Sequence, residues 1–193
     1  MARPTRYEGA DFEGAGFESA GFAGDGFAGL PLDAADQPRV QALLTACDDY
    51  ALMLTGQPNP PDAAATLFAS LPPGRGPADK LVLGIQEPDG TLIGLIDVVR
   101  EYPDPGVWFL GLLLLHPAHR SRGLGTRVYD AFAEWAFAEG CDIMRLGVVQ
   151  QNEAALRFWS RIGFQEVARH PVQFGGKPTE AVILPDVLVA DPE

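Results

Sequence analysis

The sequence predicts one α/β domain, in which a mixed sheet of about seven strands carries helices on both faces. Three observations support this fold class. Short apolar runs alternate with longer stretches whose apolar residues recur at helical spacing. Turn residues, mainly glycine and proline, separate the two kinds of segment. The 193 residues are 47% hydrophobic, which is enough to bury one sizeable core.

The predicted elements follow one another along most of the chain. In order, we expect a strand at 27–32, helices at 35–54 and 62–70, strands at 81–86, 92–100 and 107–115, a helix from 124, a strand at 143–149, a helix from 153, and strands at 164–174 and 181–189. Prolines within 58–61 end the first helix, and Asp62 is a suitable cap for the second. The sequence Glu-Pro-Asp-Gly at 87–90 is typical of the turn in a β-hairpin.

Between the strand at 107–115 and the next helix lies the most informative segment of the chain. It consists of Arg120, Ser121, Arg122, Gly123, Leu124, Gly125 and Thr126. Glycines at a strand-to-helix junction let the backbone curl tightly and present successive N–H groups. The positive end of the helix dipole adds to their attraction for anions. The segment therefore predicts a site for phosphate or pyrophosphate.

The distribution of charge supports an anion site at this loop. The chain has 26 Asp and Glu against 14 Lys and Arg, a formal net charge of −12. No acid occurs in residues 105–129, where about three would fall by chance, whereas Arg120, Arg122 and Arg127 do. A local positive focus in a negative field attracts an anionic ligand. The same net charge disfavours nucleic acid as a partner, because nucleic acid requires a broad basic surface.

A second segment identifies the kind of ligand. After the strand at 143–149 come Asn152, Ala155, Phe158, Trp159, Gly163 and Phe164. Together with Arg120, Gly123 and Gly125 of the loop, this pattern resembles the GNAT superfamily of N-acetyltransferases, which use acetyl-coenzyme A. The resemblance spans residues 27–190 and implies the GNAT acyl-CoA N-acyltransferase fold. It also implies an enzyme that moves an acetyl group from acetyl-coenzyme A to a primary amine by direct attack.

The resemblance further implies how acetyl-coenzyme A is held. The strand before the loop splays from its neighbour, and the backbone of Leu113 and Leu115 would bind the pantetheine arm. Gly111 would mark the bulge that opens the sheet, or would serve packing alone. The main-chain amides of 122–126 would hold the pyrophosphate.

Side chains at three further places complete the implied cofactor site. Arg120 or Arg122 would reach another phosphate. Asn152 would contact the pantetheine, cap its helix, or do both. Trp159 stands where many GNAT enzymes have a tyrosine acid, but indole cannot release its proton. The missing acid is tolerable, because a thiol pKa near ~8.5 makes thiolate an adequate leaving group. Trp159 would then either hydrogen-bond the sulfur or serve packing alone.

Acetyl transfer to an amine favours a general base. An amine with a pKa near ~10.4 is about one part in a thousand neutral at pH 7. Asp97 is the first candidate, because it is the only ionisable residue in the apolar run 92–99. Glu101 and Tyr102 are next, whereas His116 precedes a proline and is more typical of a turn. A structural role for Asp97, or a carboxylate that only holds a cationic substrate, is the alternative.

The remaining features bound the partners and the compartment. Two cysteines without metal-like spacing predict a reducing compartment and no metal. No stretch approaches 18 apolar residues, so we expect a cytoplasmic, bacterial-type protein without a membrane partner. The alternatives for the acceptor are a polyamine, an aminoglycoside-like compound, an amino acid and a protein N-terminus. For the oligomeric state, a homodimer is an alternative to the monomer. The alternative function is a non-catalytic acyl-CoA sensor or interaction module.

Residues 1–26 differ from the rest in composition. Phenylalanines recur every five residues at positions 12, 17, 22 and 27 in a glycine- and alanine-rich background, which resembles pentapeptide-repeat sequence. One coil cannot cover its own apolar faces. We therefore expect a flexible extension at 1–26, followed by the acetyltransferase domain at 27–193. The alternative is that the phenylalanines dock on the domain or on a second subunit.

Overall fold

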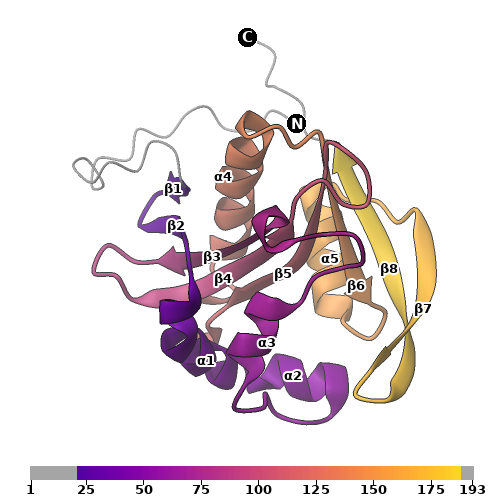
Figure 1. Ribbon diagram of the computed structural model, residues 1–193, viewed down its shortest axis with the longest axis horizontal. Coiled ribbons are helices and arrows are strands. Elements are labelled where there is room, and N and C mark those ends of the chain that lie inside the picture. The colour runs from indigo at the N-terminus through magenta and orange to yellow at the C-terminus, as the bar shows by residue number, and fades with distance from the viewer. Residues whose placement is uncertain (1–20, 188–193) are drawn as a thin grey trace.

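The computed structural model describes residues 21–187. In this part of the chain, eight strands form one mixed sheet with the order β1-β2-β3-β4-β5-β6-β8-β7 (Figure 1). The strands are β1 (Phe22–Gly24), β2 (Phe27–Pro31), β3 (Lys80–Gln86), β4 (Leu92–Val99), β5 (Val107–Leu115), β6 (Ile143–Val149), β7 (Ala168–Phe174) and β8 (Lys177–Val187). The α-helices are α1 (Gln37–Ala46), α2 (Asp48–Thr55), α3 (Ala63–Ala69), α4 (Leu124–Ala138) and α5 (Glu153–Ile162).

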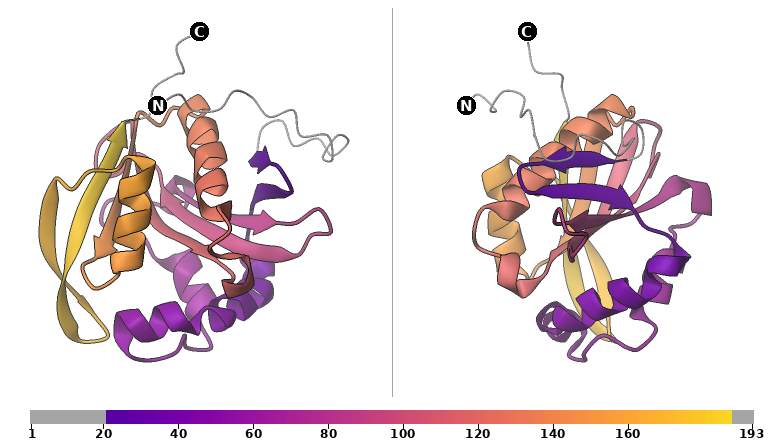
Figure 2. Two further views of the ribbon diagram at one scale, coloured as in Figure 1. Left: turned by 180° about the vertical axis from the view of Figure 1, so that it is seen from behind. Right: turned by 90° about the vertical axis from the view of Figure 1, so that its left-hand side faces the viewer.

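Helices cover both faces of the sheet, as predicted (Figure 2). In the central strand β4, Ile96 and Val98 pack in the core beneath α4, whereas Leu95 packs in the core formed with α1 and α3. This alternation follows from the two-residue period of a strand. Because both faces are buried, β4 is almost wholly apolar and Asp97 stands out in it.

The prediction of one helix at 35–54 is wrong in one respect. The segment forms two helices, α1 and α2, with a break at Cys47. The backbone of Cys47 leaves the helical region at φ −103° and ψ 27°. Its side chain is buried, and Sγ donates to the carbonyl oxygen of Leu115 at 3.5 Å. Beyond the break, Asp48 accepts hydrogen bonds from both nitrogens of Asn59. These contacts lie outside the helix, so the apolar stripe gave no sign of the break.

The eighth strand, β1, lies within the segment assigned to a flexible extension. It pairs antiparallel with β2, and the ring of Phe22 is buried against Phe27, Phe132 and Trp135. Docking on the domain, the alternative considered for these phenylalanines, therefore holds for Phe22. The resemblance to pentapeptide repeats rests mainly on residues 1–20, which lie outside the described residues.

The remaining predicted elements are confirmed with small shifts of their ends. The largest shifts are in the C-terminal hairpin, where β7 begins at Ala168 instead of residue 164 and β8 begins at Lys177. Asp62 does precede α3, but its side chain makes no capping hydrogen bond with the helix. Among residues 21–187, no helix has both the length and the apolar character that crossing a membrane requires.

Candidate active site

The site begins where two parallel strands separate. Strands β5 and β6 pair only from Val107 to Leu110 on β5, opposite 143–146 on β6. Beyond Leu110, β5 continues its pairing with β4 alone, and β6 continues with β8 alone. Among residues 21–187, one edge of 111–115 therefore has no neighbouring strand. This is the splay that the family resemblance implied.

Gly111 is a β-bulge at the start of that open edge, as expected. Val98 of β4 pairs with Leu110 and Asp97 pairs with Leu112, so Gly111 has no partner on β4. An extra residue of this kind bends a strand and changes the direction of the residues after it. The bulge thus coincides with the point at which β5 and β6 part.

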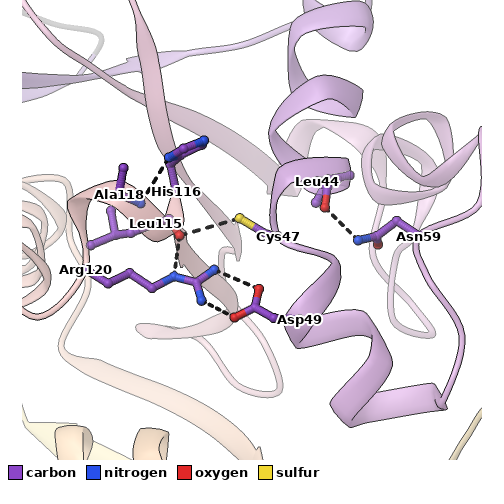
Figure 3. A network of polar contacts seen from close by, with 8 residues as sticks. All are labelled: Leu44, Cys47, Asp49, Asn59, Leu115, His116, Ala118 and Arg120. Carbon is purple, nitrogen blue, oxygen red and sulfur yellow. Dashed lines mark hydrogen bonds and ion pairs between the residues drawn. The ribbon is translucent and has the colours of Figure 1, made fainter.

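Leu113 and Leu115 direct their main-chain groups toward the open edge. The carbonyl oxygen of Leu115 accepts from Nε of Arg120 at 2.7 Å and from Sγ of Cys47 at 3.5 Å, neither of which is on β4 (Figure 3). Because N–H and C=O directions repeat every second residue in a strand, Leu113 faces the same way. The carbonyl of Leu115 is therefore hydrogen-bonded within the protein, by Arg120 and Cys47. Leu113 is the other residue whose main-chain groups point to the open edge.

The loop 120–126 has the backbone of an anion site. Ser121 and Gly123 are left-handed, with φ of 62° and 78°. Gly123 is also the N-cap of α4, and no side chain of the described residues caps this helix. The first N–H groups of a helix have no partner within it, and the first turn of α4 contains no acid. The amides of this turn are therefore available to a phosphate.

Among the loop arginines, the structure separates the two candidates for a further phosphate contact. The guanidinium of Arg120 pairs with the carboxylate of Asp49 on α2 while its Nε binds the carbonyl of Leu115 (Figure 3). This hydrogen bond from Arg120 holds the pKa of Asp49 below its ordinary value. Arg120 thus holds the loop against α2, whereas Arg122 is exposed and has no partner within the described part of the chain.

Gly125 joins the two sequence motifs in space. A Cβ at this position would lie 3.2 Å from Cε2 of Phe158 on α5. The glycine therefore lets the first turn of α4 approach α5 closely. At the start of α5, Asn152 caps the helix, because its Oδ1 accepts from the amide of Ala155 at 3.1 Å. The capping role of Asn152 is present, and its contact with pantetheine stays a prediction.

Trp159 packs in a cluster of aromatic rings. Its ring centroid lies 5.3 Å from that of Tyr129, 4.8 Å from Phe158 and 5.0 Å from Phe164, all in edge-on arrangements. The residue is buried. Edge-to-face packing of this kind stabilises a core. Of the two roles considered for Trp159, packing is therefore realised.

Asp97 borders the bulge and has a partner that the sequence analysis missed. The ammonium of Lys80 on β3 lies 2.8 Å from Oδ1 of Asp97 and donates to Oδ2 at 3.0 Å. Apart from this ion pair with Lys80, Oδ1 has no hydrogen-bond partner among residues 21–187. Oδ2 lies 3.5 Å from the position that a Cβ on Gly111 would take. Burial raises the pKa of Asp97, and Lys80 opposes this effect.

The pairing of Lys80 with Asp97 depends on an irregularity of the β3–β4 hairpin that the sequence does not mark. In a hairpin closed by the turn at 87–90, Asp97 lies opposite Val82. Lys80 is two residues from Val82 and therefore projects from the same face of the sheet. Counting the register outward from the turn, where Gln86 pairs with Leu92, would have set Asp97 opposite Leu81, because such a count leaves out the irregularity between Ile85 and Gln86.

The other candidate bases lie elsewhere or serve the backbone. Oε2 of Glu101 accepts from the amide of Gly106 at 2.9 Å, in the turn at the beginning of β5. The loop 120–126 follows the opposite end of this nine-residue strand, so the structure does not bring Glu101 to the loop. Nδ1 of His116 accepts from the amide of Ala118 at 3.2 Å, as in the expected turn. Asp97 is the candidate that lies beside the bulge at which the open edge begins.

Comparisons with known proteins agree with this geometry. Residues 46–164 match the model of the acetyltransferase (GNAT) family. An uncharacterised N-acetyltransferase of Bacillus subtilis, YobR, is 31% identical over 80 residues, which are 42% of this chain and 30% of that protein. The L-methionine sulfoximine/L-methionine sulfone acetyltransferase of Salmonella typhimurium is 34% identical over 64 residues, 32% of this chain and 37% of that protein. The matches thus span about a third of each relative's length.

The fold is shared with solved structures along nearly the whole chain. A probable acetyltransferase of the GNAT family from Chromobacterium violaceum superposes with a TM-score of 0.73 at 19% identity, covering 97% of this chain and 96% of that one. At this identity the likeness concerns the fold.

Proposed function

The chain belongs to the acetyltransferase (GNAT) family, and we propose that it transfers the acetyl group of acetyl-coenzyme A to a primary amine. One observation carries the proposal: the unpaired edge of β5 leads directly to the uncapped N-terminus of α4. The unpaired strand edge can hydrogen-bond the amide groups of pantetheine, and the N-terminus of α4 can bind a pyrophosphate. Asp97 lies at the bulge where that edge begins.

Acetyl-coenzyme A, when bound, supplies a thioester for attack by the amine. In the proposed complex, the amides of 122–126 hold the pyrophosphate and Arg122 contacts a further phosphate. The backbone of Leu113 hydrogen-bonds the pantetheine arm, and the side-chain amide of Asn152 approaches it from α5. Arg120 positions the loop through Asp49 and does not touch the ligand.

Asp97 is the proposed general base. The amine attacks the thioester carbonyl, a C–N bond forms, the C–S bond breaks, and the proton of the amine passes to the Asp97 carboxylate. A base works best when its pKa lies close to the working pH, and burial moves the pKa of Asp97 upward from its ordinary value. The thiolate leaves without an acid, because Trp159 has no proton to give at working pH.

The experiment is a thermal-shift measurement with coenzyme A and acetyl-coenzyme A, followed by release of free thiol with a panel of amines. We expect coenzyme A to raise the melting temperature of the wild type and Gly123→Val to abolish the shift. Gly90→Val is a matched control, because Gly90 also has a positive φ of 86° and open space around it, but lies in the β3–β4 turn. Absence of a shift in the wild type would overturn the proposal. A shift without thiol release from any amine would indicate an acyl-CoA sensor instead.

A further inference from the structure

An arginine whose Nε atom lacks a hydrogen-bond partner among the described residues lies in the sheet, on β6. Arg145 stands on β6 between Met144 and Leu146, whose side chains are in the core beneath α4. By the alternation of a strand, Arg145 projects from the opposite face. Its Nε atom is buried and has no hydrogen-bond partner among residues 21–187. A buried donor of this kind is normally satisfied, so its partner is to be sought in a ligand.

The face from which Arg145 projects is open around it. The core between the sheet and α1–α3 includes residues of β3, β4 and β5 and of the segment between β2 and β3. None of its described members comes from β6 or β8. Gly111 and Gly147 are exposed, although both are in central strands. Where a Cβ would stand on Gly147, the neighbours are Phe109 at 3.8 Å and Ile183 at 3.6 Å. The surface beside Arg145 is therefore formed by glycine and apolar side chains.

The charged side chains considered on this face are the Lys80–Asp97 pair near the bulge and Arg145 on β6. Strands β5 and β6 contain no Asp or Glu, although the chain has 26 of them. Asp97 shares a face with Leu95, which is the face of Arg145. The register sets Asp97 beside Leu112 on β5 and Arg145 beside Phe109, close to the end of the β5–β6 pairing. The two strand spacings between β4 and β6 amount to about 10 Å, and Arg145 is level with Val99, two residues or about 7 Å along β4 from Asp97, so the two Cα atoms lie about 12 Å apart. An arginine side chain and a small amino acid together can bridge this separation.

We propose that Arg145 binds a carboxylate of the acceptor, so that the acceptor is an amine that also carries a carboxylate, such as an amino acid. This inference rests on the proposed function and narrows its substrate. The guanidinium offers a planar pair of donors that matches a carboxylate. With its carboxylate on Arg145, the amine of such a molecule points toward Asp97 and the bulge. Polyamines lack the group that Arg145 requires.

The test compares matched pairs of amines as acceptors: L-amino acids, their carboxamides, and the corresponding decarboxylated amines. With the wild type we expect kcat/KM to be roughly 10- to 100-fold higher for the amino acid of each set. Arg145→Met should remove this preference, mainly by raising KM for the amino acid, and should leave the decarboxylated amine unchanged. Arg145→Lys should retain part of the preference. Arg157→Met, on an exposed arginine of α5, is the control and should change nothing.

The outcomes separate the two proposals. Equal kcat/KM for the members of each set, or a preference that survives in Arg145→Met, would overturn the role of Arg145 while leaving acetyl transfer intact. No thiol release with any amine would overturn the proposed function and this inference with it. Should Arg145→Met fail to fold, Arg145→Lys decides the question: it should retain only part of the wild-type preference, and an undiminished preference would overturn the role of Arg145.

Discussion

Lys80 and Asp97 form a buried ion pair beneath the proposed acceptor site. Their side chains are only 5% and 15% exposed, so solvent screens the pair weakly. Lys80 also donates to the carbonyl of Ser70 at 2.8 Å, so it connects β3 and β4 to the end of α3. The carboxylate proposed as the base is thus held by a cation that opposes the effect of burial on its pKa.

Removal of this cation should change both stability and the pH profile. Lys80→Met leaves the Asp97 carboxylate buried without a partner, and we expect the free energy of unfolding to fall by about 3–5 kcal/mol at neutral pH. The pKa of Asp97 rises further, so the acid limb of kcat/KM moves to higher pH. Denaturant unfolding and pH–rate profiles measure the two effects. Arg39→Met, which breaks a partly exposed pair with Asp36, should cost less than about 1 kcal/mol.

An unchanged acid limb in Lys80→Met would contradict Asp97 as the base. For Asp97→Asn we expect kcat/KM to fall by about 10²–10⁴-fold. The thermal shift with coenzyme A should persist in this variant, because Asp97 does not contact the phosphates in the proposed complex.

Two aspartates should give opposite pH dependences of stability. Burial raises the pKa of Asp97, so its contribution is complete below the unfolded value near 3.8 and is lost as the pH rises through the folded value. Arg120 lowers the pKa of Asp49, so that contribution is present above 3.8 and is lost as the pH falls. The stability of Asp97→Asn relative to the wild type should therefore increase as the pH rises.

The Asp49→Asn variant should be slightly less stable than the wild type at neutral pH and equal to it in acid. Its effect should stay under about 1 kcal/mol, because the Asp49 side chain is 59% exposed. Melting temperatures of the three proteins over a pH series test both signs, and parallel curves for the two variants would refute the assignment.

The close approach of α4 and α5 should appear as coupling between two side chains. Gly125→Val places methyl groups against Phe158, which we expect to cost about 1–3 kcal/mol through overpacking. In a Phe158→Ala background the same substitution should cost clearly less. A double-mutant cycle by denaturant unfolding measures the coupling. Additive effects of the two substitutions would show that the helices adjust independently.

The strand β1 should contribute to stability as part of the core. Phe22→Ala removes a buried ring that packs on Phe132 and Trp135, and we expect a loss of about 3–5 kcal/mol. Val167→Ala is the control, because Val167 is 62% exposed and should change stability by less than about 0.5 kcal/mol. Equal melting temperatures for the two variants would contradict the packing of Phe22.

Much of the fold followed from local pattern, and the exceptions have physical causes. The hairpin 87–90 and the loop 120–126 were predictable because turn chemistry is set by neighbouring residues. The break at Cys47 was not, because the thiol's partner, Leu115, is 68 residues away. The strand of Phe22 was missed because three residues are too few to show a period.

In the candidate site too, some features follow from local sequence and others depend on tertiary contacts. The sequence by itself determined where an anion-binding loop was to be expected, since glycines, a helix start and an arginine are read from a few adjacent residues. Only the tertiary structure decided the partners: Arg120 with Asp49, Asp97 with Lys80, and Arg145 with none among the described residues. Partners of this kind depend on the register of strands and on helices packed from distant parts of the chain, and a local pattern carries no information about either.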